Sequence, residues 1–274
     1  MKRIKEHFSS NLRQIFEIII LVVVAVIPFF VNLQDLFKSY LDSTPLSPDN
    51  LPWYIALSHG NLVASIILFC FMLYKIRKFN QGFLMNGENV YHDYCYCWYW
   101  FCSKILGIKK CNLVLVPIFM QFKLVIRGTF EEYPLTDDEY PIVDNEPDCK
   151  VEIINKDASN NEINFILEDT YLVDFKQIPK SKQELLTIKV SRNDGKTNGR
   201  HFSKKFIETI INELRKLKES MTINVYATTN PKNTVHIAKR AFALGNRGNV
   251  KQLHVFQQKG SGRRKFEDRG HKIY

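Results

Sequence analysis

The fold of this chain is decided by the stretch Phe16-Glu-Ile-Ile-Ile-Leu-Val-Val-Val-Ala-Val-Ile-Pro-Phe-Phe-Val31. A second apolar run follows from Trp53 to Tyr74. Each run has about the twenty residues that a helix needs to cross the hydrocarbon core of a bilayer. The basic start is typical of a secretion signal, but no small-x-small cleavage site follows Val31 and the second run comes soon after. The sequence therefore predicts a helical hairpin that stays in the membrane, with spans at about residues 15–37 and 53–74.

The charges that flank the two spans predict their orientation. Residues 1–14 hold four Lys or Arg against one Glu, and Lys75, Arg77 and Lys78 follow the second span. The connecting loop, residues 38–52, holds one Lys against two Asp. Because cationic flanks stay in the cytoplasm, we expect both termini and the soluble domain to be cytoplasmic, with the short loop outside.

The length of the chain suggests how the rest is divided. Beyond the predicted hairpin at residues 1–79, 195 residues remain, enough for a separate hydrophobic core. We expect an aromatic juxtamembrane connector at 80–111, a β-rich half at 112–180 and an α/β half with a basic tail at 181–274.

The formal net charge of +10 is unevenly distributed. Residues 131–169 hold thirteen Asp or Glu against two Lys, whereas residues 239–274 hold ten Lys or Arg against two acids. An acidic middle and a basic end indicate internal complementarity, an anionic ligand, or a surface close to lipid headgroups.

Polar residues interrupt the second span near its outer half, at Ser58, His59, Gly60 and Asn61. One interpretation is helix–helix packing, in which Gly60 permits close approach and Asn61 forms a hydrogen bond across the pair. The other is that His59 and Asn61 face an aqueous path once several hairpins assemble. Both interpretations stay open at this point.

Five of the six cysteines fall on the predicted cytoplasmic side, where disulfides are rare. His92, Cys95, Cys97, Cys102 and Cys111 supply enough donors for a zinc site, but their spacing lacks the paired C-x₂-C knuckles of common structural sites. We therefore expect reduced thiols and no metal. The same segment is dense in aromatic residues, which we expect in the core or at the membrane interface. A surface for nucleobase stacking is the alternative.

The soluble part changes its pattern partway along. Apolar runs in the β-rich half predict strands at residues 112–117, 122–127, 150–154 and 164–167. The α/β half predicts further strands at 185–190, 222–227 and 252–256. Between these, Ser203 begins one helix, and residues 234–244 form another that Gly245 stops. Strands that alternate with helices predict a βαβαβ unit with a parallel, Rossmann-like sheet.

In such sheets, ligands collect at the carboxyl ends of the strands. Residues 191–196 follow one predicted strand, and residues 228–232 follow the next and lead into a helix. Hydroxyls, amides and a lysine at a helix N-terminus suit an anion, so we expect a phosphate-bearing ligand. An ordinary capped turn on a solvated basic face is the alternative. The candidate ligand-binding residues are Arg192, Lys196, Arg200, Thr228, Thr229, Asn230, Lys232, Lys239 and Arg240.

The sequence contains no motif that indicates catalysis. The Gly-x-x-x-x-Gly-Lys phosphate loop is absent, as are His-Glu-x-x-His and Gly-x-Ser-x-Gly. Asp93, Glu168 and Asp169 have no evident partner. We therefore expect that the chain is not an enzyme.

The segment from Thr222 to Phe256 resembles the C-terminal part of SAVED domains. It has a hydrophobic strand, a small-residue turn, a helix that ends in Ala243-Leu-Gly245, and a final strand. The resemblance covers residues 185–256. SAVED domains resemble fused CARF-type Rossmann units and sense cyclic oligonucleotides in bacterial anti-phage systems of the CBASS type.

Together with the two membrane helices, this layout is similar to that of two-transmembrane SAVED effectors. The resemblance implies a membrane hairpin followed by a cytoplasmic α/β domain, Rossmann/CARF-like and SAVED-type, with an additional β-rich half. It implies an effector that binds a cyclic oligonucleotide, without a further cofactor, and forms homo-oligomers that permeabilise the bacterial inner membrane. A functionally linked nucleotidyltransferase would be its partner. The alternatives are a two-helix membrane toxin of another defence system, such as a retron, gated by nucleic acid or a protein, and a membrane-tethered hydrolase or nuclease.

Overall fold

The computed structural model describes residues 11–32, 35, 38, 42–43, 45–136, 138–143, 146, 148–158, 161–192, 200–243, 250–260 and 264–274. The chain falls into two compact units. The hairpin unit consists of Met1–Glu88 and Trp100–Lys110, and the sheet unit consists of Asn89–Tyr99 and Cys111–Tyr274.

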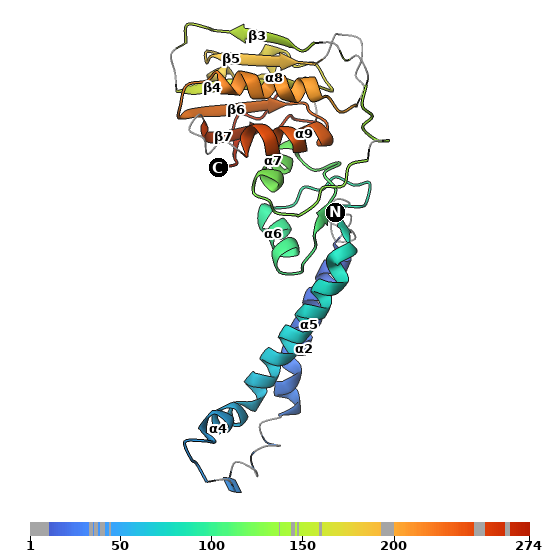
Figure 1. Cartoon of the computed structure of the whole chain (residues 1–274), viewed down its shortest axis with the longest axis vertical. Coiled ribbons are helices and arrows are strands. Elements are labelled where there is room, and N and C mark those ends of the chain that lie inside the picture. The colour runs from blue at the N-terminus through green and yellow to red at the C-terminus, as the bar shows by residue number, and fades with distance from the viewer. Residues whose placement is uncertain are drawn as a thin grey trace. The chain divides into compact units, whose positions relative to one another are not determined.

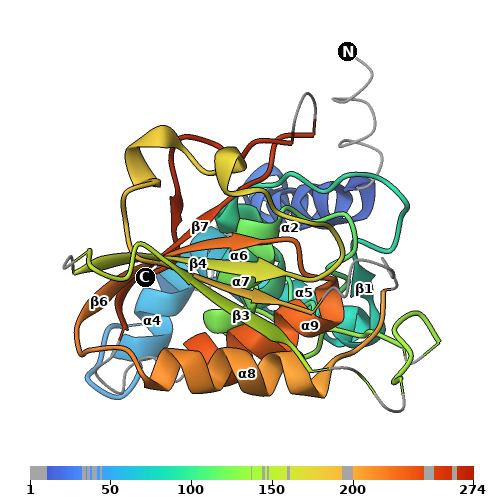
Figure 2. The same ribbon diagram turned by 90° about the horizontal axis from the view of Figure 1, so that it is seen from above.

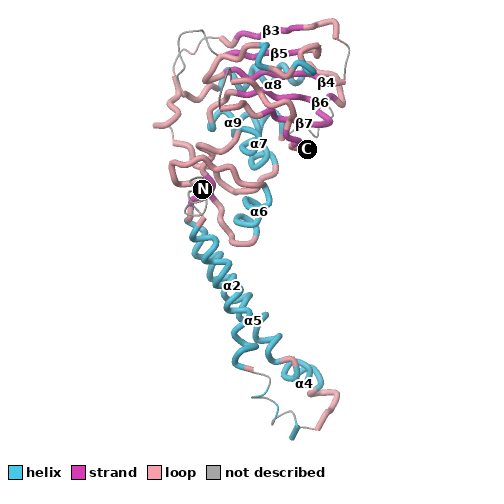
Figure 3. The backbone as a smooth tube through the Cα atoms, turned by 180° about the vertical axis from the view of Figure 1, so that it is seen from behind, coloured by secondary structure: helices cyan, strands magenta, loops and turns pink. Residues whose placement is uncertain are grey.

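Two long helices, α2 (Leu12–Val31) and α5 (Gly60–Phe79), lie side by side in the hairpin unit (Figures 1 and 3). By length and composition α2 can cross a membrane. Ser65 donates a hydrogen bond to the carbonyl of Ala25 across the pair. The helix α2 ends at Asn32, whose φ of 52° is left-handed, and most of the predicted span beyond it lies outside the described residues.

The prediction of one continuous helix for the second span was wrong. Helix α4 (Leu51–Ser58) ends at His59, and it is bent by 84° against the following segment, Gly60–Gly82. The side chains of Ser58 and His59 both form hydrogen bonds to the carbonyl of Ile55, at 2.9 and 3.1 Å. Such side-chain bonds compete with the helix, and Gly60 weakens it further. The bent pair forms a second span only if α4 and α5 are taken together.

A buried polar cluster connects the start of α2 with the end of α5. Arg13 donates hydrogen bonds to Glu17 Oε1 at 3.1 Å and to Asn80 Oδ1 at 2.6 Å. Asn80 Nδ2 donates in turn to Glu17 Oε2 at 2.8 Å and to the carbonyl of Leu106 at 3.0 Å. Asn80 is fully buried, so this one amide joins both helices to the segment Trp100–Lys110.

Arg77 makes a second connection from α5 to the same segment. Its guanidinium donates hydrogen bonds to the carbonyls of Lys104 and Ile105. Gly107 packs against the Arg77 side chain with a φ of 77°, and a Cβ at this glycine would come within 3.0 Å of Arg77 Cβ. Only glycine therefore fits this turn without strain. The short elements of this region are η1 (Asn80–Gly82), β1 (Leu84–Met85), α6 (Tyr96–Lys104) and β2 (Lys110–Cys111).

The sheet unit is built on a six-stranded sheet with the order β3-β5-β4-β6-β7-β8 (Figure 1). The strands are β3 (Lys150–Ile154), β4 (Glu162–Glu168), β5 (Thr187–Ser191), β6 (Met221–Ala227), β7 (Val250–Phe256) and β8 (His271–Lys272). The central strands β5, β4, β6 and β7 are parallel, and β3 and β8 pair antiparallel at the edges. Most residues of β4 and β6 are buried, as expected for parallel strands covered on both faces.

Figure 2 shows α8 and α9 on one face of the sheet and the yellow 3₁₀ turns on the other. The helices of this unit are α7 (Ile118–Ile126), α8 (Lys204–Arg215) and α9 (Pro231–Ile237), which a π-helical turn continues at Ala238–Phe242. The 3₁₀ turns are η2 (Phe175–Gln177) and η3 (Lys180–Lys182). Side chains from β4, β6 and β7 form a core cluster with residues of the turns and the C-terminal segment: Ile166, Val173, Ile178, Tyr226, Phe256 and Phe266.

Most of the predicted strands and one helix start are confirmed. The strands expected at 150–154, 164–167, 185–190, 222–227 and 252–256 correspond to β3 to β7. Ser203 caps α8, since its hydroxyl accepts a hydrogen bond from the backbone N–H of Phe206 at 3.0 Å. The second predicted helix begins earlier than expected, at Pro231, because Asn230 provides the cap.

The strands predicted at 112–117 and 122–127 are wrong. The first is a turn region, and most of the second lies in α7. The run Ile118–Ile126 buries Met120, Phe122, Leu124 and Val125 among others, so nearly all of its apolar residues reach the core from a helix. Strand propensity depends on context, and packing against α9 outweighs it here.

The boundary predicted at residue 180 does not separate two halves of the fold. Strand β4, from the predicted β-rich half, lies between β5 and β6, and β3 pairs with β5. The predicted βαβαβ unit is therefore part of a larger sheet whose centre is an earlier strand.

Candidate functional site

A cavity of about 350 Å³ lies at the carboxyl ends of three parallel strands. Residues that directly follow β4, β6 and β7 line it: Thr170 and Tyr171, Thr228 to Pro231, and Gln257 to Gly260. Strand β4 connects to β5 on one side, whereas its other neighbour, β6, connects to β7 on the opposite side, so the connections after these two adjacent strands run in opposite directions. Open α/β sheets bind ligands at such a switch point.

Asp169, the residue after β4, holds the turn between β6 and α9, which forms part of the cavity wall. Its Oδ2 accepts hydrogen bonds from the backbone N–H of Asn230 at 3.0 Å and from the side-chain amides of Asn230 and Asn233 at 3.1 and 2.9 Å. Its side chain is fully buried. The sequence offered no evident partner for Asp169, and the structure corrects this.

Arg192 completes the Asp169 cluster and does not line the cavity. Its Nε lies 2.6 Å from Asp169 Oδ1, and its guanidinium also contacts the His201 ring. The Arg192 side chain is only 3% exposed. Arg192, a candidate ligand residue, therefore supports the cavity wall, because its charge is neutralised by the buried carboxylate of Asp169.

Glu168 also has partners that the sequence did not reveal. Lys189 Nζ lies 2.8 Å from Glu168 Oε2, and the Ser191 hydroxyl donates a hydrogen bond to Oε1. The backbone N–H of Val173 donates to Oε2 at 2.6 Å. Glu168 thus ties the end of β4 to β5 and to the following turn.

Thr228, Thr229 and Asn230 line the cavity, as a site after β6 requires. Their side chains serve the local structure: Thr228 Oγ1 donates to the carbonyl of Tyr171 at 2.8 Å, and the Thr229 and Thr234 hydroxyls lie 2.7 Å apart. Asn230 Oδ1 accepts from the backbone N–H of Asn233 at 2.9 Å. The donors expected to hold an anion at this helix start are therefore satisfied from within the chain, which corrects that part of the prediction.

Three cations line the cavity, namely Arg200, Lys259 and Arg264, and no Asp or Glu belongs to the lining that the structure describes. All three cations are exposed. The Arg264 guanidinium lies 4.5 Å from the centre of the Tyr171 ring, and Lys259 Nζ lies 3.9 Å from the exposed carboxylate of Asp268. Cations without carboxylates in the lining make the cavity attractive to an anion. Arg200 was expected at the site, whereas Lys259 and Arg264 were seen only as part of a basic tail.

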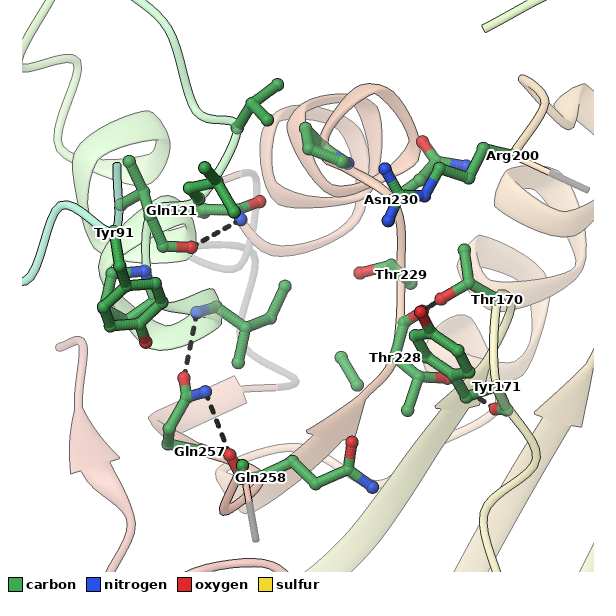
Figure 4. A pocket seen from close by; sticks show the side chains of 18 of the residues that line it. Tyr91, Gln121, Thr170, Tyr171, Arg200, Thr228, Thr229, Asn230, Gln257 and Gln258 are labelled. Carbon is green, nitrogen blue, oxygen red and sulfur yellow. Dashed lines mark hydrogen bonds between the residues drawn. The ribbon is translucent and has the colours of Figure 1, made fainter. Parts of the chain in front are cut away.

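Three tyrosines contribute to the lining: Tyr91, Tyr140 and Tyr171. Figure 4 shows Tyr91 and Tyr171 on opposite sides of the cavity. Tyr140 is buried, and burial together with Glu139 raises its pKa while Arg200 acts in the opposite direction. The aromatic block near residue 91 thus contributes the ring of Tyr91 to the cavity lining.

Two lining residues have left-handed backbones although neither is glycine. Leu115 has a φ of 59° and Arg264 a φ of 50°. The carbonyl of Leu115 accepts a hydrogen bond from the backbone N–H of His92 at 2.9 Å, which helps to hold this turn. Sparsely populated conformations of this kind gather at functional sites.

Of the remaining candidate residues, the three that the structure describes do not line the cavity. Lys232 is buried, with its Nζ 5.4 Å from the centre of the Phe202 ring and 3.5 Å from the carbonyl of Tyr140. Lys239 and Arg240 are exposed on the π-helical turn. Lys196 lies outside the described residues.

Asn61 and His59, the two candidate polar residues of the second span, belong to the hairpin unit. Asn61 Nδ2 donates a hydrogen bond to Asn32 Oδ1 at 3.3 Å, which joins α5 to the end of α2. His59 is exposed at the break between α4 and α5. The position of Asn61 is the one that the packing interpretation requires.

Within the described part of the chain, no three His, Cys, Asp or Glu side chains come together as they do around a metal ion. Cys102 and Cys111 are buried, and Cys95 and Cys97 are exposed. Burial raises the pKa of the Cys149 thiol to about 11, with a further contribution from Glu146. A thiol of this kind is a poor nucleophile at neutral pH.

A comparison with known families relates the whole chain to one of them. A family model described as "SMODS- and Ubiquitin system-associated 2TM effector domain" (SUa-2TM) matches residues 1–274. No curated protein matches the chain.

Two solved structures of the Acinetobacter baumannii Cap4 SAVED/CARF-domain containing receptor are similar to the chain. The structure with the cyclic trinucleotide 2'3'3'-cAAA shares 8% identity at a TM-score of 0.42, covering 88% of this chain and 64% of the receptor. The structure with 3'3'3'-cAAA shares 7% identity at a TM-score of 0.42, covering 88% and 65%. The chain thus spans less than two thirds of the length of these receptors.

Proposed function

Because the chain belongs to the SMODS- and Ubiquitin system-associated 2TM effector family, we propose that it is a membrane-permeabilising effector of bacterial anti-phage defence. In this proposal the sheet unit binds a cyclic oligonucleotide made by a partner nucleotidyltransferase of a CBASS system. Binding drives the assembly of several copies, and the assembled hairpins open the inner membrane. The chain acts without catalysis.

The observation that carries this proposal is the composition of the cavity at the switch point. Arg200, Lys259 and Arg264 surround it and no carboxylate lines its described part, which favours a ligand with phosphate groups. Tyr91 and Tyr171 offer aromatic faces to bases. A ligand with both phosphates and bases uses both features.

The volume of the cavity adds a constraint on how such a ligand would be held. About 350 Å³ is close to the lower end of the roughly 300–1,000 Å³ that small-molecule pockets occupy. A ring of several nucleotides would therefore extend beyond the cavity. The exposed part of the ring would be available to a second copy of the chain, which supports assembly upon binding.

The hairpin supports membrane permeabilisation as the proposed activity. A single pair of helices cannot enclose a path for water, because the apolar side chains of α2 and α5 that face away from the pair meet lipid. Several hairpins are needed, and a ligand promotes their assembly only if it binds the assembled state more tightly. The proposed orientation, with both termini in the cytoplasm, places the sheet unit where a cytoplasmic nucleotide reaches it.

Dye release from vesicles tests this proposal. The full chain is reconstituted in vesicles of phosphatidylethanolamine and phosphatidylglycerol loaded with a self-quenching dye, and cyclic di-, tri- and tetranucleotides are added. At least one of them should release the dye. Arg264→Glu should weaken its binding by more than the roughly 1.5–3 kcal/mol of one charged hydrogen bond, because repulsion replaces attraction.

Arg215→Glu is the matched control, because Arg215 is an exposed arginine of α8 outside the cavity lining. This variant should behave like the unmodified chain. Release that no cyclic nucleotide stimulates would overturn the proposal. Equal binding by the Arg264→Glu and Arg215→Glu variants would move the ligand away from this cavity.

A further inference from the structure

The Tyr171 ring already has a partner in the cavity. The guanidinium carbon of Arg264 lies 4.5 Å from the centre of this ring, in a cation–π contact. Both residues line the cavity and both are exposed, Tyr171 at 40%. A base that stacks on this face of Tyr171 therefore has to replace Arg264.

Hydrogen bonds hold the backbone at Tyr171 in place. Thr170 Oγ1 donates to the carbonyl of Thr228 at 2.5 Å, and Thr228 Oγ1 donates to the carbonyl of Tyr171 at 2.8 Å. The backbone N–H of Thr170 donates to the same Thr228 carbonyl at 3.1 Å. Figure 4 shows these three residues together on one wall of the cavity. The ring therefore projects from a fixed backbone at the ends of β4 and β6.

Arg264 combines an anchored segment with a charge that is available to a ligand. Two residues further on, Phe266 is 1% exposed, and its backbone N–H donates to the carbonyl of Gln177 at 3.0 Å. Among the described residues no carboxylate pairs with the Arg264 guanidinium, and the Tyr171 ring is its one partner. The long side chain of Arg264 can therefore turn from the ring to another partner while the anchored segment stays in place.

The ring and the guanidinium each have a stronger partner in a nucleotide. The stack of a nucleobase on an aromatic ring is worth more than the contact of an exposed arginine with tyrosine. A phosphate suits the guanidinium, because its planar fork forms two charge-assisted hydrogen bonds at once. A phosphorylated nucleoside therefore improves both contacts, whereas a nucleoside without phosphate leaves the displaced guanidinium to water.

We propose that a nucleotide binds by exchange: its base takes the place of Arg264 on the Tyr171 ring, and the Arg264 guanidinium turns to its phosphate. The exchange selects phosphorylated ligands, because only a phosphate gives the displaced guanidinium a charged partner. This inference rests on the proposed function and deepens it by assigning the pair of residues that rejects unphosphorylated nucleosides.

AMP and adenosine test the exchange, since these two probes differ only in the phosphate. The full chain in lipid nanodiscs is titrated with each probe, and saturation-transfer NMR measures the affinities. Arg264→Asn shortens the side chain and tolerates the left-handed φ of 50°. This variant should bind AMP at least about 10-fold more weakly, because the charged hydrogen bonds to the phosphate are lost. It should bind adenosine about 2- to 5-fold more tightly, the factor that corresponds to one exposed cation–π contact.

The gain in adenosine affinity should require Tyr171. Tyr171→Leu should weaken both probes, and adding Arg264→Asn to it should no longer tighten adenosine. Arg215→Asn changes an exposed arginine of α8 outside the cavity lining and should change neither affinity. Thermal unfolding of each variant checks that it folds.

The outcomes separate this inference from the proposed function. Any result for Arg264→Asn other than weaker AMP and tighter adenosine overturns the exchange, while AMP binding by the unmodified chain still supports nucleotide sensing. A gain in adenosine affinity that persists in Tyr171→Leu overturns the assignment of the pair. The exchange is also overturned if a cyclic oligonucleotide binds and neither probe does. If none of the three binds, the proposed function fails and this inference fails with it.

Discussion

Arg192 and Asp169 form a buried ion pair, with 2.6 Å between Arg192 Nε and Asp169 Oδ1, one residue away from the wall of the cavity. Asp169 in turn holds Asn230 and Asn233, which shape the turn between β6 and α9. The positive charge of Arg192 therefore positions the wall, and the charges available to a ligand come from Arg200, Lys259 and Arg264.

Arg192→Met should destabilise the chain strongly. It leaves the Asp169 carboxylate buried without its counter-charge, and breaking a buried pair in this way typically costs about 3–5 kcal/mol. Denaturant unfolding of the sheet unit within the full chain measures the loss. Arg215→Met, at an exposed position of α8, should stay within about 0.5 kcal/mol. A stable Arg192→Met variant that has lost nucleotide affinity would instead make Arg192 a direct ligand.

Ser203→Ala should lower the free energy of unfolding by about 1 kcal/mol, because the N-cap bond to the backbone N–H of Phe206 is lost. Ser203→Gly should cost only a few tenths of a kcal/mol, since glycine is tolerated at this position of a helix. The same unfolding measurement distinguishes the two variants. Equal losses would show that the cap contributes little to α8.

The stability of the sheet unit should fall in mild acid through His236. Burial, followed by repulsion from Arg240, Lys239 and Lys232, lowers the pKa of His236 below its usual value of 6.5. Because the folded chain favours the neutral ring, this stability is fully present above about pH 6.5 and is lost as the pH falls through the folded pKa. His236→Gln should flatten the difference in unfolding free energy between about pH 7.5 and about pH 5. His254, whose pKa is also lowered by burial, should contribute separately. If the pH dependence of unfolding is unchanged in His236→Gln, groups other than His236 cause it.

Asn80→Leu should separate ligand binding from membrane leakage. Asn80 joins Arg13, Glu17 and the carbonyl of Leu106 within the hairpin unit, and losing these buried bonds should cost about 1–3 kcal/mol for each group left unpaired. The cavity belongs to the other unit, so nucleotide affinity should stay within about 2-fold while dye release decreases. Equal loss of both activities would contradict this division of roles.

Asn61→Leu decides between the two interpretations of the polar residues in the hairpin. Since Asn61 bonds Asn32 within the same hairpin, packing predicts an unchanged conductance of the open assembly and at most about 1–2 kcal/mol of lost association. Single-channel recordings in planar bilayers measure the conductance. A marked change in conductance or ion preference would show that Asn61 faces the aqueous path.

The strands of this fold could be predicted where short apolar runs lie between turn residues, as at 162–168 and 221–227. Local patterns failed where packing decides. The run Ile118–Ile126 has no polar stripe that marks a helix, and it is helical because it lies against α9 and β7. The break at His59 follows from side-chain bonds to one carbonyl, which hydropathy does not register.

The candidate site was predicted only in part for a related reason. Thr228, Thr229 and Asn230 follow a recognisable strand, and their place at its carboxyl end was clear from the sequence. Gln121, Lys259 and Arg264 reach the cavity from other segments, and their proximity depends on the strand order around β4. The pairing of Arg192 with Asp169 depends on that order as well, because β5 lies next to β4.

The polar groups at the two ends of the hairpin also bear on how thick a membrane it fits. Fourteen residues separate Glu17 from Asn32, which is about 21 Å of helix at 1.5 Å per residue. Thirteen residues separate Asn61 from Lys75, which is about 20 Å. Both lengths are shorter than the roughly 30 Å of a bilayer core. However, Glu17 is turned into the pair and is only 6% exposed, while Leu12 and Phe16 are apolar and exposed. The lipid-facing length of α2 is therefore that of the whole helix, Leu12–Val31, about 30 Å. The polar groups thus lie on the inner side of the hairpin at membrane depth, and a bilayer of ordinary thickness fits it without deformation.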